Sequence, residues 1–538
     1  MGEVLSQNQE MSPFAKAVFA RTYAFYLGET WHECAARVAK AVASDTKQEQ
    51  QFYEMIRDRI FVPGGRYLYC SGRPIQQFSN CFGLIPGDSR EDWASTLHDA
   101  VMCLSMGGGI GVNYSRLRSK GSPVGRMGGV ASGPVSLAQM VNEVARHVMA
   151  GGARRSALWA GLDWTHADIQ EFIQVKDWDS DIRALKAKRY EAPAPLDMTN
   201  MSVIIGEHYL QGLERHDPTT WDLHRQICHS MARTGEPAFR NQSLILRDDP
   251  TGYGGNPCQE STLGHRSVCN LGSIVLSRIR DLSHLEEVTR LATQFLINGS
   301  VRGDYPVPEI SERARIERRI GLGFMGLHEW MLMRGYRYEW SEELARWLSV
   351  WKAVNDEEAD RYADRLGERR PWVRRAVAPT GTISIIAQTT SGIEPVYCTA
   401  YKRRYLNGDQ HYFQFVIDPT AKRLLDDGVL LKDIEDAYQL SHDFTRRLEV
   451  QAQVQTYVDQ AISSTVNVPE WSGSDNGTNP RIAEVIASYL PRLKGLTIYP
   501  DKARPGQPLV PVSFEEAREQ EGVVFEESGE CSNGVCGL

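Results

Sequence analysis

The apolar positions near the start of the chain recur at the spacing of an α-helix. Within residues 11–60 the pattern is clearest at 14–19 and again at 31–42, where apolar side chains return every three or four positions. Thr30 stands directly before the second run and is a favourable helix N-cap. The sequence therefore predicts a helical region over residues 1–60.

Farther along, the pattern changes to shorter apolar runs that are bounded by glycine, proline and asparagine, as is typical of strands. The runs that read as strands are 78–88, which ends in a turn, 268–274 and 495–500. Residues 435–465 are predicted to be mostly helical, and 466–469 end that element. The chain thus mixes helices with short strands, and it contains no internal repeat or low-complexity block.

Size and charge limit the classes of function. A chain of 538 residues can bury a large core and has room for three or four domains, or fewer if one of them is a barrel. The formal net charge of -8 argues against general nucleic-acid binding, which needs a basic face. A local basic pocket for a small phosphorylated molecule is still compatible with this charge.

The sequence also lacks the usual signals for membranes and secretion. No apolar run approaches the roughly 18 to 20 residues that a membrane span needs. The first residues do not form a basic segment followed by an apolar one, although Gly2 and Ser6 fit the loose pattern for myristoylation. We therefore expect a cytoplasmic enzyme that does not bind membranes.

The ten cysteines are spread thinly, which is unlike a small disulfide scaffold. Cys81 has the small polar neighbours Ser79 and Asn80, a setting that favours a reactive thiol over an inert core thiol. Cys531 and Cys536 lie in an acidic, glycine-rich C-terminal segment. Two ligands do not close a tetrahedral zinc site, so we predict a mobile dithiol that exchanges with another disulfide, and no metal site.

One short stretch combines a thiol, an amide and a carboxylate. Asn256, Cys258 and Glu260 stand two residues apart, and Pro257 favours an extended backbone. In an extended segment the three side chains would point the same way. Such a group suits hydrogen chemistry at carbon, with the sulfur reacting and the carboxylate acting as general base. The alternative is a surface loop with an incidental cysteine.

Three stretches that contain glycine are candidates for binding phosphate. Residues 106–114 lack the spacing of a dinucleotide fingerprint, so close backbone approach within the core is an equally good interpretation. Residues 151–157 combine two glycines with two arginines and suit a loop over an anionic ligand, although a plain exposed turn would look similar. Residues 378–384 join hydroxyl groups and a glycine, and a helix beginning there would offer free N–H groups to a phosphate.

Taken in order, these motifs resemble the catalytic subunit of ribonucleotide reductase from about residue 20 to the C-terminus, most closely class II, the adenosylcobalamin-dependent enzymes. The resemblance implies a ten-stranded α/β barrel with a central finger loop over 61–516, after an N-terminal helical region over 1–60. It also implies a flexible redox-active tail over 517–538. The implied activity is the reduction of the ribose 2′-hydroxyl in ribonucleoside di- or triphosphates.

The resemblance assigns roles to the finger-loop residues. Cys258 matches the thiyl radical site that takes the 3′ hydrogen from the ribose. Glu260 matches the base at the 3′-hydroxyl, and Asn256 matches a residue that hydrogen-bonds the substrate. The family usually has glycine where this chain has Gln259, a departure that bears on the conformation of the loop but not on the three functional positions.

The resemblance also assigns roles to four other cysteines. Cys81 and Cys269 match the pair that supplies two electrons and becomes a disulfide, with Cys81 on the face from which the 2′-hydroxyl leaves as water. Cys531 and Cys536 match the tail dithiol that reduces this pair again, and a thioredoxin-like protein would reset the tail. Together these residues provide the hydrogen abstractor, proton source and two electrons that the reaction needs.

Substrate and effector sites follow from the same resemblance. The family's substrate-phosphate turn corresponds to Pro379, Thr380, Gly381, Thr382, Ile383 and Ser384. Asp88 lies seven residues after Cys81, as does the family aspartate at the specificity site for dNTP or ATP. Arg118 would meet effector phosphates there. The loop at 151–157, with Arg154 and Arg155, matches the loop that links the effector to substrate choice. The resemblance allows a homodimer.

The source of the radical distinguishes the classes. In class I the radical comes from a separate metal-containing subunit through two adjacent tyrosines near the C-terminus, whereas here Tyr499 is followed by Pro500. This favours adenosylcobalamin, whose cobalt–carbon bond supplies the radical, and leaves an unusual class I subunit as the alternative. Class III lacks a tail dithiol, and we expect no N-terminal ATP-binding domain. A nucleotide-binding scaffold or a dithiol exchange protein would not explain the finger-loop residues.

Overall fold

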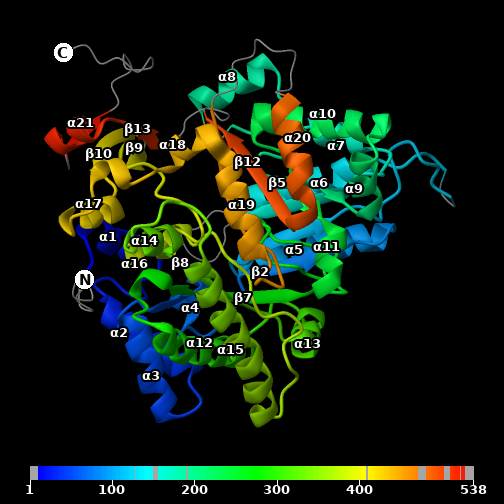
Figure 1. Cartoon of the computed structure of the whole chain (residues 1–538). Coiled ribbons are helices and arrows are strands. Elements are labelled where there is room, and N and C mark those ends of the chain that lie inside the picture. Colours follow the sequence, from blue (N-terminus) through cyan, green and yellow to red (C-terminus); the bar gives the residue numbers. More distant parts are fainter. Residues whose placement is uncertain are drawn as a thin grey trace.

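The computed structural model describes residues 10–125, 128–148, 156–189, 192–407, 410–469, 480–501, 509–520 and 523–526. In these segments the N-terminal helices lie on one side of a large sheet (Figure 1). A small separate sheet is formed by strands that come late in the sequence.

The predicted N-terminal helices are present, and each begins at a capping residue. They are α1 (Pro13–Thr22), α2 (Trp31–Val42) and α3 (Thr46–Arg57). Thr30 caps α2 in a capping box with Glu33, as its position before the apolar run predicted. The apolar faces of α2 and α3 pack against α12 (Leu282–Arg302), which in turn packs against α15 (Glu342–Leu366).

The first half of the large sheet is parallel throughout. Its neighbouring strands are β2 (Cys81–Leu84), β3 (Gly109–Asn113), β4 (Leu158–Asp163), β5 (Thr199–Ile205) and β6 (Ala238–Asn241). Parallel neighbours need crossover connections, usually helices. Here these are α5 (Arg90–Ser105), α6 (Pro134–His147), α7 (Ile169–Gln174), α8 (Ser180–Lys188), α9 (Glu207–Glu214) and α10 (Pro218–Thr234).

The second half of the sheet is also parallel and closes the sheet into a barrel. It contains β7 (Val268–Val275), β8 (Ile320–Met325), β11 (Thr465–Val468) and β12 (Gly495–Pro500). Residues 373–377 bridge β8 to the segment before β11, because Leu322 N–H donates to Arg374 O (2.9 Å) and Ser463 N–H donates to Val377 O (2.9 Å). β2 pairs with β7 and β6 pairs with β12, both antiparallel, which joins the halves.

This arrangement confirms the expected ten-stranded α/β barrel. The ten strands of the sheet include β1 (Phe61–Pro63), which lies beside β7 in line with β2. All eight residues of β7 are buried, which fits a strand covered on both faces.

A loop of residues 252–263, which we call the finger loop, runs inside this barrel. Its two arms are joined where Gly254 and Leu263 exchange backbone hydrogen bonds of 2.6 and 3.1 Å. Side chains from two strands of the wall reach it: Asn200 Nδ2 donates to Pro257 O (2.8 Å) and Arg240 Nη2 donates to Gly254 O (2.5 Å). The loop is therefore surrounded by the wall that holds it.

Glycines in the wall make room for the loop. A Cβ atom added at Gly111 in β3 would lie 1.9 Å from the Gly255 carbonyl oxygen, and one at Gly109 would lie 2.9 Å from Pro257. A real Cβ atom cannot approach backbone so closely. Of the two interpretations of the glycine-rich stretch 106–114, close backbone approach in the core is the one that the structure supports.

The remaining elements surround the barrel or form the small sheet. The helices are α4 (Gly65–Cys70), α11 (Gln242–Asp248), α13 (Pro308–Glu317), α14 (Leu327–Leu332), α16 (Gly381–Ala387), α17 (Pro419–Asp426), α18 (Ala437–Leu440), α19 (Phe444–Gln455), α20 (Pro480–Tyr489) and α21 (Phe514–Glu519). The small sheet has the order β13 (Leu509–Pro511), β9 (Ala400–Asn407), β10 (Gln410–Ile417) and β14 (Val524–Glu526).

Residues 435–465 are mostly helical, as predicted, but the helical part ends at Gln455 and does not continue to the end of the range. α19 ends at Gln455, and the chain then turns back to bond with the barrel through Ala461 before it enters β11. The apolar residues after the helix pack where the barrel closes. Periodicity alone does not distinguish such residues from those of a helix.

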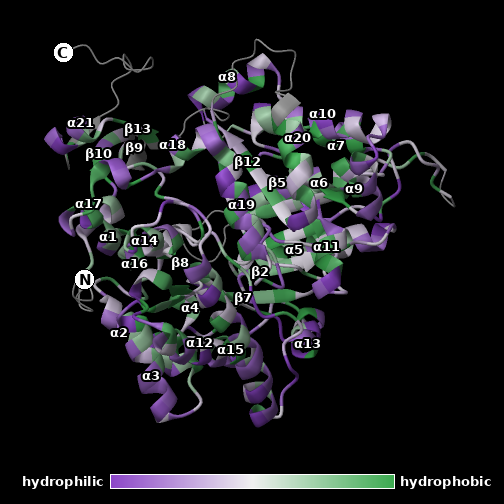
Figure 2. Cartoon of the chain, in the orientation of Figure 1, coloured by the Kyte–Doolittle hydropathy of each residue, from purple (hydrophilic) through white to green (hydrophobic). Residues whose placement is uncertain are grey.

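Polar and apolar residues separate as expected for a protein with a closed core. Figure 2 shows mainly hydrophilic residues on α3 and at one end of α15, whereas β7 inside the molecule is largely hydrophobic. In the part of the chain that the structure describes, no helix has the length and apolar character needed to cross a membrane.

The packing of the finger loop against β3 can be tested by adding one methyl group. We expect Gly111→Ala to lower the free energy of unfolding by about 1–3 kcal/mol, because the new Cβ would meet backbone that cannot move aside cheaply. Urea denaturation measures the change. Gly125→Ala is the matched control, since a Cβ there meets nothing within 4 Å. Equal stability of the two variants would show that the loop does not pack here.

Candidate active site

The tip of the finger loop, β2 and the start of α16 surround a cavity of about 260 Å³. Four residues that the sequence singled out line it together: Cys81, Asn256, Cys258 and Glu260. The volume lies just below the range for small-molecule sites, roughly 300–1,000 Å³. Cys258 is exposed, whereas the other three side chains are buried. The cavity is therefore lined by one exposed sulfur, that of Cys258, and by three buried side chains.

The tip of the loop is a turn, which corrects the expectation of an extended segment. Gln259 N–H donates to Asn256 O (3.0 Å), and Gln259 has a φ of 66° in the left-handed region. That region is costly for any residue but glycine, by about 1–2 kcal/mol. Gln259 thus adopts the conformation that favours the glycine usual in the resembling family. Asn256, Cys258 and Glu260 reach one cavity through this turn instead of through strand alternation.

Asn256 connects the finger loop to β2. Its Nδ2 donates to Cys81 Sγ (3.0 Å), and its Oδ1 accepts from Ser261 N–H (2.9 Å). With 1% of its surface exposed, the side chain has little freedom. The amide therefore fixes the distance between the loop and the Cys81 thiol.

Glu260 is a buried carboxyl group whose pKa is unusually high. Burial raises the pKa of Glu260 to about 7, and hydrogen bonding by Asn256 partly offsets this rise. Its Oε2 has no hydrogen-bond partner among the described residues. A carboxyl group that titrates near neutral pH suits proton transfer, because both of its protonation states are accessible.

Cys81 and Cys269 stand directly opposite each other on the antiparallel strands β2 and β7. Such pairs have Cα atoms about 4.5–5.5 Å apart with side chains on one face, a separation that a disulfide can span. Burial raises the pKa of Cys269 to about 12 and raises that of Cys81 well above its usual value, with Glu260 adding to the latter. Both thiols therefore carry their protons at neutral pH.

The start of α16 forms another wall of the cavity. Pro379, Thr380, Gly381, Thr382 and Ile383 line it, whereas Ser384 does not and pairs with Ser391 (Oγ–Oγ 2.8 Å). Thr380 has a φ of 51°, and its hydroxyl accepts from Gly392 N–H (2.8 Å), which holds this strained turn in place. The turn thus forms a wall of the cavity that the bond from Gly392 holds in place.

Comparison with known proteins identifies the family. A model described as the ribonucleotide reductase barrel domain matches residues 79–220, 206–355 and 370–499, and one described as the ribonucleotide reductase all-alpha domain matches 9–76. The chain belongs to the ribonucleotide reductase family.

Curated relatives and a solved structure extend this result. A "Vitamin B12-dependent ribonucleoside-diphosphate reductase" of Mycobacterium tuberculosis is 31% identical over 92% of this chain and 77% of its own length. A protein of the same name from Thermoplasma acidophilum is 29% identical over 88% of this chain and 68% of its own. The class Id ribonucleotide reductase alpha subunit of Actinobacillus ureae shares the fold, with a TM-score of 0.75, 16% identity, and coverage of 93% and 99% of the two chains.

Two of the effector residues expected for this reductase chain, Asp88 and Arg118, do not line the cavity. Asp88 and Arg118 are brought together, since Arg118 Nε contacts Asp88 Oδ2 at 2.6 Å and Arg118 N–H donates to Asp88 Oδ1 (3.0 Å). Arg154 and Arg155 lie outside the described residues, as do the tail cysteines Cys531 and Cys536.

Sequence reasoning missed two lining residues of the reductase cavity. Tyr23, at the end of α1, is 1% exposed and its hydroxyl has no hydrogen-bond partner among the described residues. Arg66, in α4, is the only cation among the described lining residues. Ser12 N–H donates to Gln388 Oε1 (2.5 Å), which fastens α1 alongside α16. No local motif signals these residues, because only packing of the helical region brings them to the barrel.

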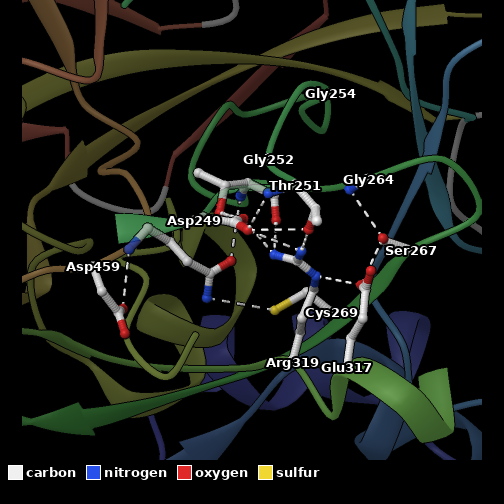
Figure 3. A network of polar contacts seen from close by, with 12 residues as sticks. Asp249, Thr251, Gly252, Gly254, Gly264, Ser267, Cys269, Glu317, Arg319 and Asp459 are labelled. Carbon is white, nitrogen blue, oxygen red and sulfur yellow. Dashed lines mark hydrogen bonds and ion pairs between the residues drawn. The ribbon is translucent and has the colours of Figure 1, made fainter. Parts of the chain in front are cut away.

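A buried ionic network supports the base of the finger loop (Figure 3). Arg319 contacts Asp249 and Glu317, each at 2.5 Å, with all three side chains at most 1% exposed. Although burial alone would raise the pKa of Asp249, Arg319 lowers it below its usual value. Thr262, in the loop, donates to Asp249 Oδ2 (2.6 Å) and its carbonyl accepts from Arg319 Nη1 (2.9 Å). Charges of this kind are costly to bury unless fully paired, and the pairing fixes the loop.

The environment of Glu260 predicts a titration near neutral pH. We expect the infrared band of its protonated carboxyl group, isolated as the difference between wild type and Glu260→Gln, to disappear as the pH rises through about 7. The carboxyl would be protonated below this pH and ionised above it, because burial penalises the charged form. A midpoint near 4.5, the ordinary value for glutamate, would contradict the account of the site.

Proposed function

We propose that this chain is a class II ribonucleotide reductase that reduces ribonucleoside diphosphates to deoxyribonucleotides with a radical from adenosylcobalamin. The observation that carries the proposal is that one cavity is lined by both the exposed Cys258 and the buried Cys81, and that Cys269 stands directly opposite Cys81 on the neighbouring strand. The B12-dependent relatives support the choice of cofactor, and the names of the two quoted above support the diphosphate.

Each reacting residue has a step that fits its setting. The Cys258 sulfur, as a radical, takes the 3′ hydrogen of the ribose, while Glu260 accepts the proton of the 3′-hydroxyl. Cys81 protonates the 2′-hydroxyl, which leaves as water. Cys269 then gives its hydrogen to the 2′ carbon, and formation of the Cys81–Cys269 S–S bond releases the second electron to the sugar. Glu260 returns its proton to the 3′ oxygen, and Cys258 returns hydrogen to the 3′ carbon. In sum, a C–O bond becomes a C–H bond, two thiols become a disulfide, and one water is released.

The residues at the accessible side of the cavity fit a bulky cofactor. When bound, adenosylcobalamin supplies a carbon-centred radical from homolysis of its cobalt–carbon bond. The cavity of about 260 Å³ is too small to hold a corrin beside a nucleotide, so the cofactor would be held outside it, next to the exposed Cys258. The partly exposed Gly107, which lines the cavity and carries no side chain to obstruct the cofactor, would form part of its support.

Substrate and partner contacts complete the proposal. The turn from Pro379 to Ile383 would bind the substrate phosphates, with Arg66 contributing positive charge from another wall. Cys531 and Cys536 would reduce the oxidised pair and receive electrons from a thioredoxin-like protein. A dNTP or ATP effector would bind near Asp88 and Arg118, which do not line the cavity.

Turnover of CDP tests the proposal directly. We expect deoxynucleotide formation from CDP only when adenosylcobalamin and a dithiol are both present, and we expect Cys258→Ser to lower kcat by at least about 10³-fold, because a hydroxyl cannot replace the thiyl radical. Cys70→Ser is the control, since Cys70 does not line the cavity.

A different result would contradict each part of the proposal: the source of the radical, the substrate and the mechanism. Activity that needs a metal-containing partner subunit instead of adenosylcobalamin would identify a class I subunit. Turnover of CTP but not CDP would overturn the choice of diphosphate. Full activity in Cys258→Ser would exclude the radical mechanism itself.

A further inference from the structure

Gln460 is a buried amide that lies beside one thiol of the redox pair. It is 0% exposed and stands in the segment between α19 and β11. Its Nε2 donates to Ile320 O (2.8 Å) and lies 3.8 Å from Cys269 Sγ, within hydrogen-bond range for sulfur. This is the dashed line that reaches the Cys269 sulfur in Figure 3.

The same segment is braced to the finger loop. Gln460 Oε1 accepts from Thr262 N–H (3.3 Å), and the next residue donates from Ala461 N–H to Glu260 O (2.9 Å). Gln455 Nε2 in turn donates to Gln460 O (3.0 Å). The side-chain amide is thus fixed by partners on β8 and the finger loop, and its N–H group is held toward Cys269, whereas Gln455 bonds only the backbone carbonyl of Gln460.

The two thiols differ in access from the cavity. Cys81 lines the cavity, whereas Cys269 does not and is 0% exposed. A dithiol that enters the cavity therefore reaches the Cys81 sulfur of the oxidised pair. Its thiolate forms a bond to Cys81 Sγ, the Cys81–Cys269 bond breaks, and Cys269 leaves with the electron pair.

We propose that Gln460 is a positioning residue that stabilises Cys269, the sulfur that access from the cavity selects as the leaving group, when the oxidised pair is reduced. This inference rests on the proposed function, which makes Cys81 and Cys269 the oxidised pair. The amide N–H faces the sulfur on which negative charge develops, and a hydrogen bond to a charged acceptor is stronger than one to a neutral acceptor. A better-stabilised leaving thiolate departs faster. Cys269 then takes a proton, and the second thiol of the reductant releases Cys81 as its own disulfide forms.

Thiol–disulfide exchange tests this role without substrate or cofactor. The pair is oxidised with diamide, the Cys81–Cys269 bond is verified by peptide mapping, and re-reduction by dithiothreitol is followed over time. We expect Gln460→Met to slow re-reduction about tenfold, since it removes the donor but keeps a similar shape. Gln460→Glu keeps an acceptor for Thr262 N–H and should be slowed further as pH rises, because a carboxylate opposes the leaving thiolate.

Gln455→Met is the matched control. It removes hydrogen bonds to Val458 O and Gln460 O, both 3.0 Å, from the same segment without touching a thiol. We expect it to lower Tm but to leave the exchange rate within about twofold of wild type. Equal slowing by Gln455→Met and Gln460→Met, wild-type exchange in both Gln460 variants, or failure of the wild-type pair to form would overturn the inference. Normal exchange in a wild-type protein that does not turn over CDP would instead overturn the proposed function alone.

Discussion

The backbone carbonyls of the finger loop are hydrogen-bonded to the barrel at three points, and the active site depends on these bonds. Gly254 O, Pro257 O and Glu260 O accept from Arg240, Asn200 and Ala461 respectively. A loop inside a closed barrel cannot rely on bulk water, so its polar groups need partners in the wall. Because the partners come from both halves of the barrel, the finger loop holds Cys258 in place only when the barrel is closed.

Burial then divides the chemistry among the sulfurs. Cys258 is exposed and can receive a radical from outside, whereas Cys81 and Cys269 are enclosed and remain protonated at neutral pH. Glu260 shares that enclosure, which brings its pKa to about 7. The proposed roles thus follow from burial. The exposed Cys258 is the hydrogen abstractor, the buried and protonated thiols are the reductant, and the buried Glu260 with its raised pKa is the base.

The sequence predicted those parts of the structure that depend on local chemistry. Helical periodicity and the Thr30 cap located the N-terminal helices, because capping involves neighbours in the chain. The spacing of Asn256, Cys258 and Glu260 singled out Cys258, but the prediction of an extended backbone there was wrong. Gln259 has a left-handed conformation and lies in a turn that its surroundings hold. Gln460 gave no signal, because its contact with Cys269 spans 191 residues. Tyr23 also gave no signal, because the residues with which it lines the cavity lie far from it in the sequence.

The most direct test of the central claim is a single turnover without external reductant. Reduced protein, truncated before Cys531 so that the tail cannot intervene, would be mixed with CDP and adenosylcobalamin, and product and disulfide would be quantified together. The account predicts one deoxynucleotide for each Cys81–Cys269 disulfide that peptide mapping detects. Product without that disulfide, or a disulfide between Cys258 and either partner, would contradict the assignment of the radical thiol and the reducing pair.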